Sequence, residues 1–418
     1  MLKKNIELTE ILKACERLEG IAKKSPLEFN QRLSEKYSQN IYFKREDLQP
    51  VRSYKIRGAY NLIASLTSEE KSRGVVTASA GNHAQGFAFA CAKLKIKGIV
   101  YMPEVTPKQK IEKVKYFGKD FVEIRLVGKV FDEASKEAQR ICSENKMVFV
   151  HPFDDPRTIA GQATIGVEIL QELPDCDLIV VPVGGGGLSA GIISYLAQVK
   201  SKAEIIIVDI LDAPKLLNSI GKSEPVLLDK ISTFVDGCAV KKMGKLNFEI
   251  INSSKPKIIG VDTGLVCTNM VDLYQFDGIA VEPAGAVSVS GLEEILKNEK
   301  RKNLNIVCVI SGGNNDISRY PEILERSLIY KGLKHYFIVE FAQKPGELKK
   351  FLDKVLGEND DIVLFEYMKK TNKESGPALV GIESKVKEDY AKLIKRMEEN
   401  EIGFREVTGD KTLFELLI

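Results

Sequence analysis

The strongest constraint on the fold is an alternation of short apolar runs with amphipathic helical stretches, which continues from residue 74 to residue 310. The runs are apolar nearly throughout, as in Ile179, Val180 and Val181, and do not alternate with polar residues. Such runs separated by helices are typical of parallel sheets that are covered by helices on both faces. We expect strands at residues 40–44, 74–78, 98–102, 122–126, 147–150, 178–183, 204–210, 257–261 and 305–310.

Three segments rich in glycine and small polar residues directly follow expected strands, at residues 79–86, 184–187 and 311–316. In open α/β folds ligands bind at the carboxyl ends of the strands, where such segments meet. We therefore expect the three segments to contribute to one site.

The middle segment consists of four consecutive glycines, which lie between a buried strand and the helix that begins near Leu188. Consecutive glycines allow several backbone N–H groups to converge on one anion, and the helix N-terminus adds positive potential. The residues Gly184, Gly185, Gly186, Gly187 and Leu188 therefore predict a phosphate site.

A dinucleotide site is the alternative for this segment. Gly185, Gly187 and Ala190 have the spacing of a Rossmann fingerprint, and Asp209 ends a later strand as a candidate ribose ligand. This hypothesis leaves Lys55, Asn82 and Ser311 without a role.

Lys55 lies at the start of an expected helix, between an aromatic residue and Gly58. A lysine amine becomes a nucleophile when its surroundings lower its pKa. We expect the positive charges of Arg57, Lys44 and Arg45 to disfavour its ammonium form. The chain has 61 Lys and Arg residues, so the role of Lys55 depends on its partners elsewhere.

The pattern changes near residue 330. We expect strands at 334–341, 362–367 and 378–382, helices at 348–356 and 390–397, and two short strands at the end of the chain. The order β-α-β-β-α-β is that of the ferredoxin-like unit. A separate small domain is therefore predicted.

Composition excludes several classes. The chain has 418 residues and a net charge of +3, which does not indicate a nucleic-acid or membrane surface. The seven cysteines form no C-x-x-C pair, which favours a reducing compartment over disulfides or zinc. The N-terminal residues lack a signal-peptide pattern, and no apolar run reaches the roughly 18–20 residues of a membrane span. We expect a cytoplasmic protein.

Four segments together, at residues 53–61, 79–83, 184–191 and 311–316, resemble in content and order those of the fold type II pyridoxal-phosphate enzymes. Residues 44–49 and 151–155 make the similarity strongest to the biosynthetic threonine dehydratases. The resemblance implies two parallel-sheet subdomains of the tryptophan synthase β-like fold over residues 1–330, the smaller at about 46–150, and an ACT-like regulatory domain at 333–413.

The resemblance also implies roles. Lys55 would bind the aldehyde of pyridoxal 5'-phosphate and remove the Cα proton of the substrate. Asn82 would contact the ring oxygen and Ser311 the ring nitrogen, while the glycines and the Leu188 N–H hold the phosphate. The substrate carboxylate would lie at Ser79, Gly81 and His83. A hydroxyl such as that of Ser311 cannot protonate the ring nitrogen as a carboxylate would, which suits elimination.

An acidic residue, Glu282, lies in a segment that looks like the family's acidic segment near the site. A helix N-terminal acid is an equally good interpretation. In racemase-like relatives a divalent cation is held by acids after the strand that ends at Asp209. Here Lys215 takes the place of a second acid, so no metal is expected.

The implied activity is that of a threonine ammonia-lyase, a carbon–nitrogen lyase that makes 2-oxobutanoate for isoleucine synthesis. The implied partners are the substrate L-threonine, L-isoleucine as an effector at the C-terminal domain, and three further copies in a homotetramer. The alternatives are a catabolic threonine or serine dehydratase, a serine racemase-like enzyme, and a non-catalytic amino-acid sensor.

Overall fold

The computed structural model describes residues 5–297, 299–369 and 373–417. The chain forms two compact units: Met1–Thr263 with Asp277–Asn315, and Gly264–Phe276 with Asp316–Ile418. The first unit contains two parallel sheets, and the second contains one antiparallel sheet. In the described part of the chain, no helix has both the length and the apolar character that a membrane crossing requires.

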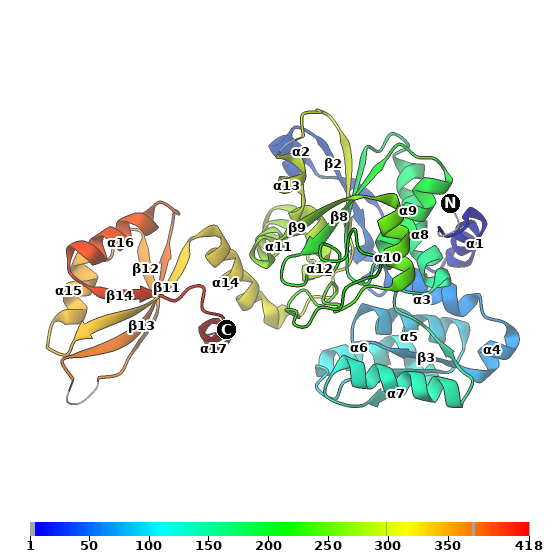
Figure 1. Ribbon diagram of the computed structural model, residues 1–418, viewed down its shortest axis with the longest axis horizontal. Helices are drawn as coiled ribbons and strands as arrows, with labels where there is room; N and C mark the ends of the chain where they lie inside the picture. The colour runs from blue at the N-terminus through cyan, green and yellow to red at the C-terminus, as the bar shows by residue number, and fades with distance from the viewer. Residues whose placement is uncertain (1–4, 298, 370–372, 418) are drawn as a thin grey trace. The chain divides into compact units, whose positions relative to one another are not determined.

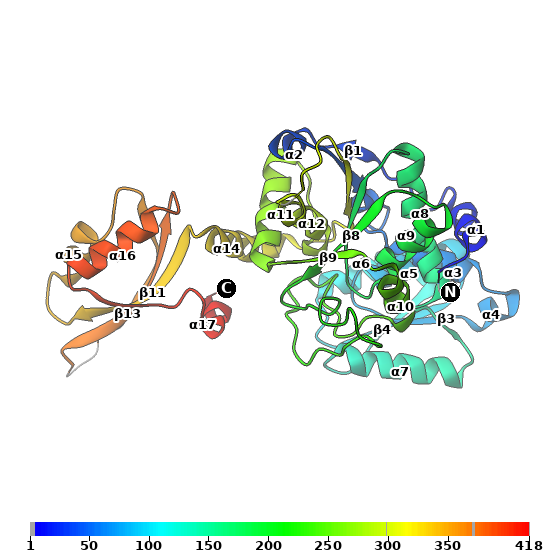
Figure 2. The same ribbon diagram turned by 45° about the horizontal axis from the view of Figure 1, so that its top comes forward.

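The larger sheet of the first unit has the strand order β1-β2-β10-β7-β8-β9. Figure 1 labels its strands β2, β8 and β9, and Figure 2 labels β1. All neighbours are parallel except β1, which pairs with β2 in the antiparallel sense. The strands are β1 (Leu27–Phe29), β2 (Asn40–Arg45), β7 (Leu178–Pro182), β8 (Glu204–Ile210), β9 (Lys257–Val261) and β10 (Asn305–Ile310).

Helices cover both faces of this sheet. On one face Ile179, Val181 and Val309 pack in a core with residues of α8 (Pro156–Glu172), α9 (Gly187–Gln198) and α10 (Lys245–Ser254). On the other, α12 (Pro283–Ser290) contacts β10, and the Ser288 hydroxyl donates to the Val309 carbonyl at 2.8 Å. The remaining helices around this sheet are α1 (Leu8–Leu18), α2 (Gln31–Tyr37), α13 (Leu292–Leu296) and the 3-10 turn η1 (Glu46–Leu48).

The smaller sheet has the order β5-β4-β3-β6 and is parallel throughout. Successive side chains along its strands point to opposite faces of the sheet. Val75 packs in the core cluster that contains Phe87, whereas Val76 packs in the cluster that contains Ala134. The elements are α3 (Lys55–Ala64), α4 (Ser68–Arg73), β3 (Val75–Ala78), α5 (Asn82–Leu94), β4 (Gly98–Met102), α6 (Lys108–Gly118), η2 (Lys119–Phe121), β5 (Val122–Leu126), α7 (Phe131–Glu144) and β6 (Val148–Phe149). The prediction of parallel sheets covered on both faces is confirmed.

The second unit has the sheet order β12-β13-β11-β14, with every pair antiparallel. Its core contains Phe337 and Val380 from the sheet and Phe351 and Leu393 from the helices. Its elements are α14 (Tyr320–Lys331), β11 (Lys334–Ala342), α15 (Glu347–Lys354), β12 (Asp360–Tyr367), β13 (Ser375–Ser384), α16 (Asp389–Glu399), β14 (Gly403–Glu406), α17 (Lys411–Leu417) and η3 (Ile317–Arg319), while α11 (Thr263–Asp277) begins in the first unit. The predicted β-α-β-β-α-β order is present.

The prediction that two short strands end the chain is wrong. Among the described residues that follow α16, β14 is the only strand, and α17 comes after it. Asp410 caps this helix, because its Oδ1 accepts the N–H groups of Thr412 at 3.0 Å and Leu413 at 3.1 Å. The sequence pattern also did not predict β1 and α2.

Candidate active site

The segments that follow β3, β7 and β10 meet at the start of α3. Ser53 bridges to Gly312, and the Tyr54 N–H donates to the Ser311 carbonyl at 3.1 Å. A Cβ on Gly86 of α5 would lie 3.0 Å from the Lys55 carbonyl oxygen. These contacts join two of the segments to the lysine. The third segment lies near it through Phe153, because a Cβ on Gly185 would collide with the Phe153 ring and Lys55 Nζ lies 6.0 Å from the centre of that ring.

Lys55 is the first residue of α3, and its ammonium donates to the Pro152 carbonyl at 3.0 Å. Burial lowers the pKa of Lys55 from 10.5 to about 8, because the charged form loses its hydration. Near neutral pH an appreciable share of this amine is therefore neutral, as nucleophilic attack requires.

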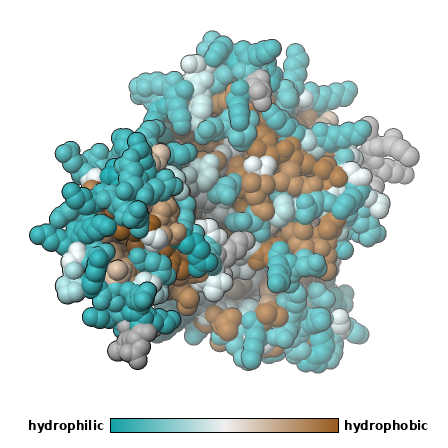
Figure 3. All heavy atoms as spheres, turned by 60° about the vertical axis from the view of Figure 1, so that its left-hand side comes forward, coloured by the Kyte–Doolittle hydropathy of each residue, from teal (hydrophilic) through white to brown (hydrophobic). Residues whose placement is uncertain are grey.

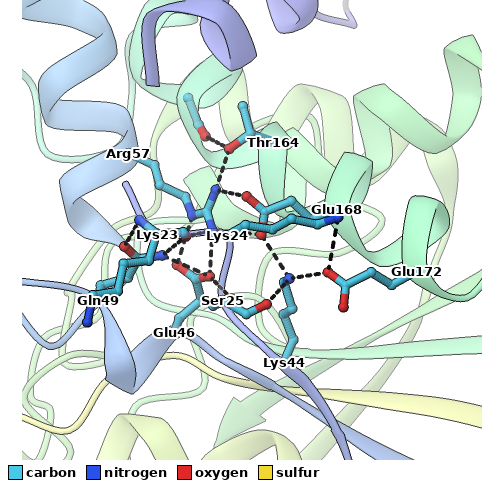
Figure 4. Close-up of polar contacts among 11 residues, drawn as sticks. Lys23, Lys24, Ser25, Lys44, Glu46, Gln49, Arg57, Thr164, Glu168 and Glu172 are labelled. Carbon is cyan, nitrogen blue, oxygen red and sulfur yellow. Dashed lines mark hydrogen bonds and ion pairs between the residues drawn. The ribbon is translucent and has the colours of Figure 1, made fainter. Parts of the chain in front are cut away.

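The expected cause of this low pKa is wrong. Arg57 and Lys44 lie in a buried network of ion pairs, where carboxylates neutralise their charge (Figure 4), and neither contributes to the low pKa of Lys55. The Arg57 guanidinium contacts Glu46 at 2.7 Å and Glu168 at 2.6 Å, and Lys44 contacts Glu168 at 2.8 Å. Residues two apart on a helix lie on different faces, which is why Arg57 faces α8 while Lys55 faces the site.

Arg45 is also paired. Its guanidinium lies 2.8 Å from Asp47 and 2.5 Å from Glu28. None of the three basic residues therefore acts on the Lys55 amine, and burial alone accounts for the direction of its pKa.

Asn82 begins α5 and is held by two side chains. Its Nδ2 donates to Glu282 Oε1 at 2.6 Å, and its Oδ1 accepts from Asn314 Nδ2 at 2.8 Å. Because Glu282 uses one amide hydrogen, the second remains available for a ligand. Asn314 was not singled out from the sequence, although it belongs to the same turn as Ser311.

Glu282 precedes α12 but forms no capping hydrogen bond there with its side chain. Burial, followed by the negative charge of Asp236, raises the pKa of Glu282 to about 7. Of the two interpretations of this residue, the contact with Asn82 favours a place in the site.

The loop before α5 offers backbone groups. The Ser79 hydroxyl accepts the Gly81 N–H at 3.3 Å, and a Cβ on Gly81 would meet no atom within 4 Å. The His83 imidazole points away to the Val150 carbonyl at 3.0 Å, and burial lowers its pKa to about 3. The backbone N–H of His83, and not its imidazole, is therefore the group that suits a carboxylate at this helix N-terminus.

The four glycines have no room for side chains. A Cβ on Gly185 would collide with the Phe153 ring, and one on Gly184 would lie 2.7 Å from the Gly237 carbonyl. Gly186 has a φ of +94°, which disfavours other residues. The Leu188 side chain is buried in the core, so only its N–H can serve an anion.

Ser311 directly follows β10 and is buried, and its hydroxyl donates to the Ala284 carbonyl at 3.1 Å. Two further buried hydroxyls of the region, those of Ser53 and Ser189, have no hydrogen-bond partner in the structure. A low-pKa amine, a glycine cradle at a helix N-terminus and a buried hydroxyl fit an aldehyde, a phosphate and a ring nitrogen. The residues present therefore fit pyridoxal phosphate.

Asp209 is unsuited to a ribose. It is fully buried, and its carboxylate accepts from Lys215 Nζ at 2.6 Å and from the Leu216 N–H at 2.8 Å. The dinucleotide alternative is thus contradicted at its acidic residue. In the described residues, no group of three His, Cys, Asp or Glu side chains could hold a metal ion.

Comparison with protein families divides the chain into two matched regions. Residues 18–312 match the model of the pyridoxal-phosphate dependent enzymes. Residues 325–417 match the model of the C-terminal regulatory domain of threonine dehydratase.

Curated relatives cover the whole chain. L-threonine dehydratase biosynthetic IlvA of Bacillus subtilis is 48% identical over 421 residues, which are 100% of this chain and 99% of the relative. The corresponding protein of Lactococcus lactis is 45% identical over 99% of this chain and 100% of its own length.

Solved structures agree. Threonine deaminase isoform 2 from Solanum lycopersicum superposes with a TM-score of 0.72 at 36% identity, covering 78% of this chain and 95% of its own. Maize serine racemase gives a TM-score of 0.71 at 27% identity, and the match covers 78% of this chain and 98% of the maize chain.

These findings confirm the predicted fold class, the cofactor and the family resemblance. The chain belongs to the biosynthetic threonine dehydratases, a group of pyridoxal-phosphate dependent enzymes that carry a C-terminal regulatory domain.

Proposed function

We propose that this enzyme converts L-threonine to 2-oxobutanoate and ammonia by α,β-elimination, as the first step of isoleucine synthesis. One observation carries the proposal: the low-pKa amine of Lys55 lies where the glycine cradle, the Asn82 loop and the Ser311 turn meet. The identity to curated biosynthetic dehydratases supports the choice of threonine as the substrate.

Each group has a task in this reaction. Bound pyridoxal phosphate supplies an aldehyde for the substrate amine and a ring that accepts electrons from Cα. Lys55 would bind the aldehyde and, once threonine has displaced it, its neutral amine would accept the Cα proton. Its pKa of about 8 suits a base that works near neutral pH.

The remaining groups orient and stabilise. The N–H groups of Gly184, Gly185, Gly186, Gly187 and Leu188 would bind the phosphate. The free Asn82 amide hydrogen would donate to the ring oxygen, and Ser311 would contact the ring nitrogen. The Ser79 hydroxyl and the N–H groups of Gly81 and His83 would hold the substrate carboxylate, since the Ser79 N–H already donates to the Tyr101 carbonyl at 3.1 Å. Because the Ser311 hydroxyl is neutral, it would not hold a positive charge on the ring nitrogen, which suits loss of the β-hydroxyl. The β-hydroxyl and the Cα proton that Lys55 accepts would together make up the water that is lost.

We propose that isoleucine binds the second unit and lowers activity. The support is the match of residues 325–417 to the regulatory domain of threonine dehydratase. We also propose that residues 1–330 and 333–413 act as the catalytic and regulatory domains, with a smaller catalytic subdomain at about 46–150.

A homotetramer is proposed as the assembly. Figure 3 shows hydrophobic patches among hydrophilic side chains on the face it presents. Large apolar residues such as Val105, Tyr116 and Leu227 are exposed, and apolar surface of this kind favours association. The buried free thiols of Cys91, Cys176, Cys238 and Cys308 support a reducing, cytoplasmic location.

Ammonia release from threonine and from serine, with and without isoleucine, tests the proposal. We expect faster release from threonine and a decrease with isoleucine. Release from serine alone would favour a serine dehydratase, and formation of D-serine would favour a serine racemase, the activity named for the similar maize structure. Isoleucine binding without ammonia release would indicate a sensor.

A further inference from the structure

The segment at residues 151–155 has no task in the proposed reaction, yet it touches both ends of the site. The Pro152 carbonyl accepts from Lys55 at 3.0 Å, and the Phe153 ring leaves no room for a side chain at Gly185. Whatever holds this segment therefore acts on both the lysine and the phosphate loop.

A single buried side chain joins this segment to the phosphate loop. Asn247, in the first turn of α10, is fully buried, and its Nδ2 donates to the Phe153 carbonyl and to the Gly185 carbonyl, both at 2.9 Å. The two amide hydrogens are thus both used. Asp154 orients α10, because its carboxylate accepts the N–H groups of Lys245 at 2.9 Å and Asn247 at 3.2 Å.

These bonds control the direction of one peptide group. The Gly185 carbonyl also accepts the Gly244 N–H at 3.2 Å, so two donors hold it toward α10. The Gly186 N–H belongs to the same planar peptide and points in the opposite direction. Glycines rotate freely, so without these donors the peptide could turn its carbonyl oxygen toward an anion.

We propose that Asn247 is a positioning residue of the phosphate cradle, which keeps the Gly186 N–H directed at the cofactor phosphate and fixes the Phe153 segment beside Lys55. The inference rests on the proposed function, since it requires phosphate binding at the four glycines. Asn247 acts through the loop backbone and leaves the substrate site to other residues.

Asn247→Asp tests the inference, because it keeps the shape of the side chain and places acceptors against two carbonyl oxygens. Cofactor-free protein is titrated with pyridoxal phosphate, and the visible absorbance of the lysine-bound form gives the dissociation constant. We expect it to rise about tenfold or more, as for the loss of a buried hydrogen bond. The phosphorus NMR resonance of the bound phosphate should shift, while the KM for threonine at saturating cofactor stays unchanged.

The matched control is Asn252→Asp on the same helix. Asn252 also bonds to backbone, at Gly221 and Lys222, but it is only partly buried, and these two hydrogen bonds do not involve the residues 184–187. We expect wild-type cofactor affinity from this control. If Asn247→Asp does not fold, Asn247→Ala removes the donor without adding charge and carries the same test.

Three results would overturn the inference. The first is a dissociation constant for Asn247→Asp within about twofold of wild type together with an unchanged phosphorus resonance. Loss of a buried hydrogen bond would weaken cofactor binding by more than this. The second is equal weakening by Asn252→Asp. The third is a wild-type protein that takes up no pyridoxal phosphate, which alone would also overturn the proposed function.

Discussion

At the scale of single residues, Lys55 combines a low pKa with a place at the head of α3. Lys55→Ala should abolish the visible absorbance of the bound cofactor and lower kcat by at least about 10³-fold, since a nucleophile and a base are both lost. Spectra and ammonia release measure the two effects. Lys93→Ala, on the exposed side of α5, is the control and should behave as wild type. A coloured, active Lys55→Ala protein would refute the assignment.

Glu282 gives a pH-dependent prediction. Its pKa is raised from 4.5 to about 7, so between these values the folded protein holds a proton that the unfolded chain releases. This residue therefore makes folding less favourable as pH rises from about 4.5 to 7. Glu282→Gln should gain stability relative to wild type over this window, by up to about 3 kcal/mol at pH 7.

Denaturant titrations of the cofactor-free proteins between pH 4.5 and 7 measure this difference. Glu293→Gln is the control, because Glu293 is an exposed residue of α13. Its substitution should not reproduce the pH-dependent gain of Glu282→Gln. A difference for Glu282→Gln that does not change between pH 4.5 and 7 would show that burial does not raise the pKa of Glu282.

At the scale of elements, the network around Arg57 fixes the first turn of α3 against α8 and η1 (Figure 4). Arg57→Met would leave the fully buried Glu46 carboxylate without its guanidinium partner. Loss of one partner of a buried pair costs about 3–5 kcal/mol. We therefore expect a large fall in the free energy of unfolding, measured with denaturant.

The control is Arg140→Met on α7, where Arg140 pairs with the exposed Glu144. A surface pair of this kind contributes at most about 1 kcal/mol. If the two substitutions destabilise the protein equally, the buried network does not hold α3 in place.

At the scale of the whole molecule, the chain is two compact units with separate cores. Removal of residues 333–418 should leave threonine ammonia-lyase activity within about threefold of wild type, because the site lies in the first unit and independent domains fold alone. Isoleucine inhibition should disappear. Ammonia release over a range of isoleucine concentrations measures both, and unchanged inhibition would place the effector site within residues 1–332.

The local features of this protein could be predicted from the sequence. Strand and helix positions follow from hydrophobic period, and the glycine run, the loop before α5 and the Ser311 turn follow expected strands. Their common location follows from the rule that parallel strands bring their carboxyl ends to one edge. Helix α17 was not predicted, because its start depends on one capping residue, Asp410, and not on a hydrophobic period.

Only the tertiary structure decided which residues far apart in the sequence pair with one another. Arg57 meets Glu168 and Asn82 meets Glu282, at separations of 111 and 200 residues. Asn247 reaches Gly185 across 62 residues. The sequence by itself determined which residues have the chemistry for this reaction, since turn geometry and periodicity are local. The direction of each side chain, and hence the cause of the low Lys55 pKa, depends on burial, which exists only after the chain has folded.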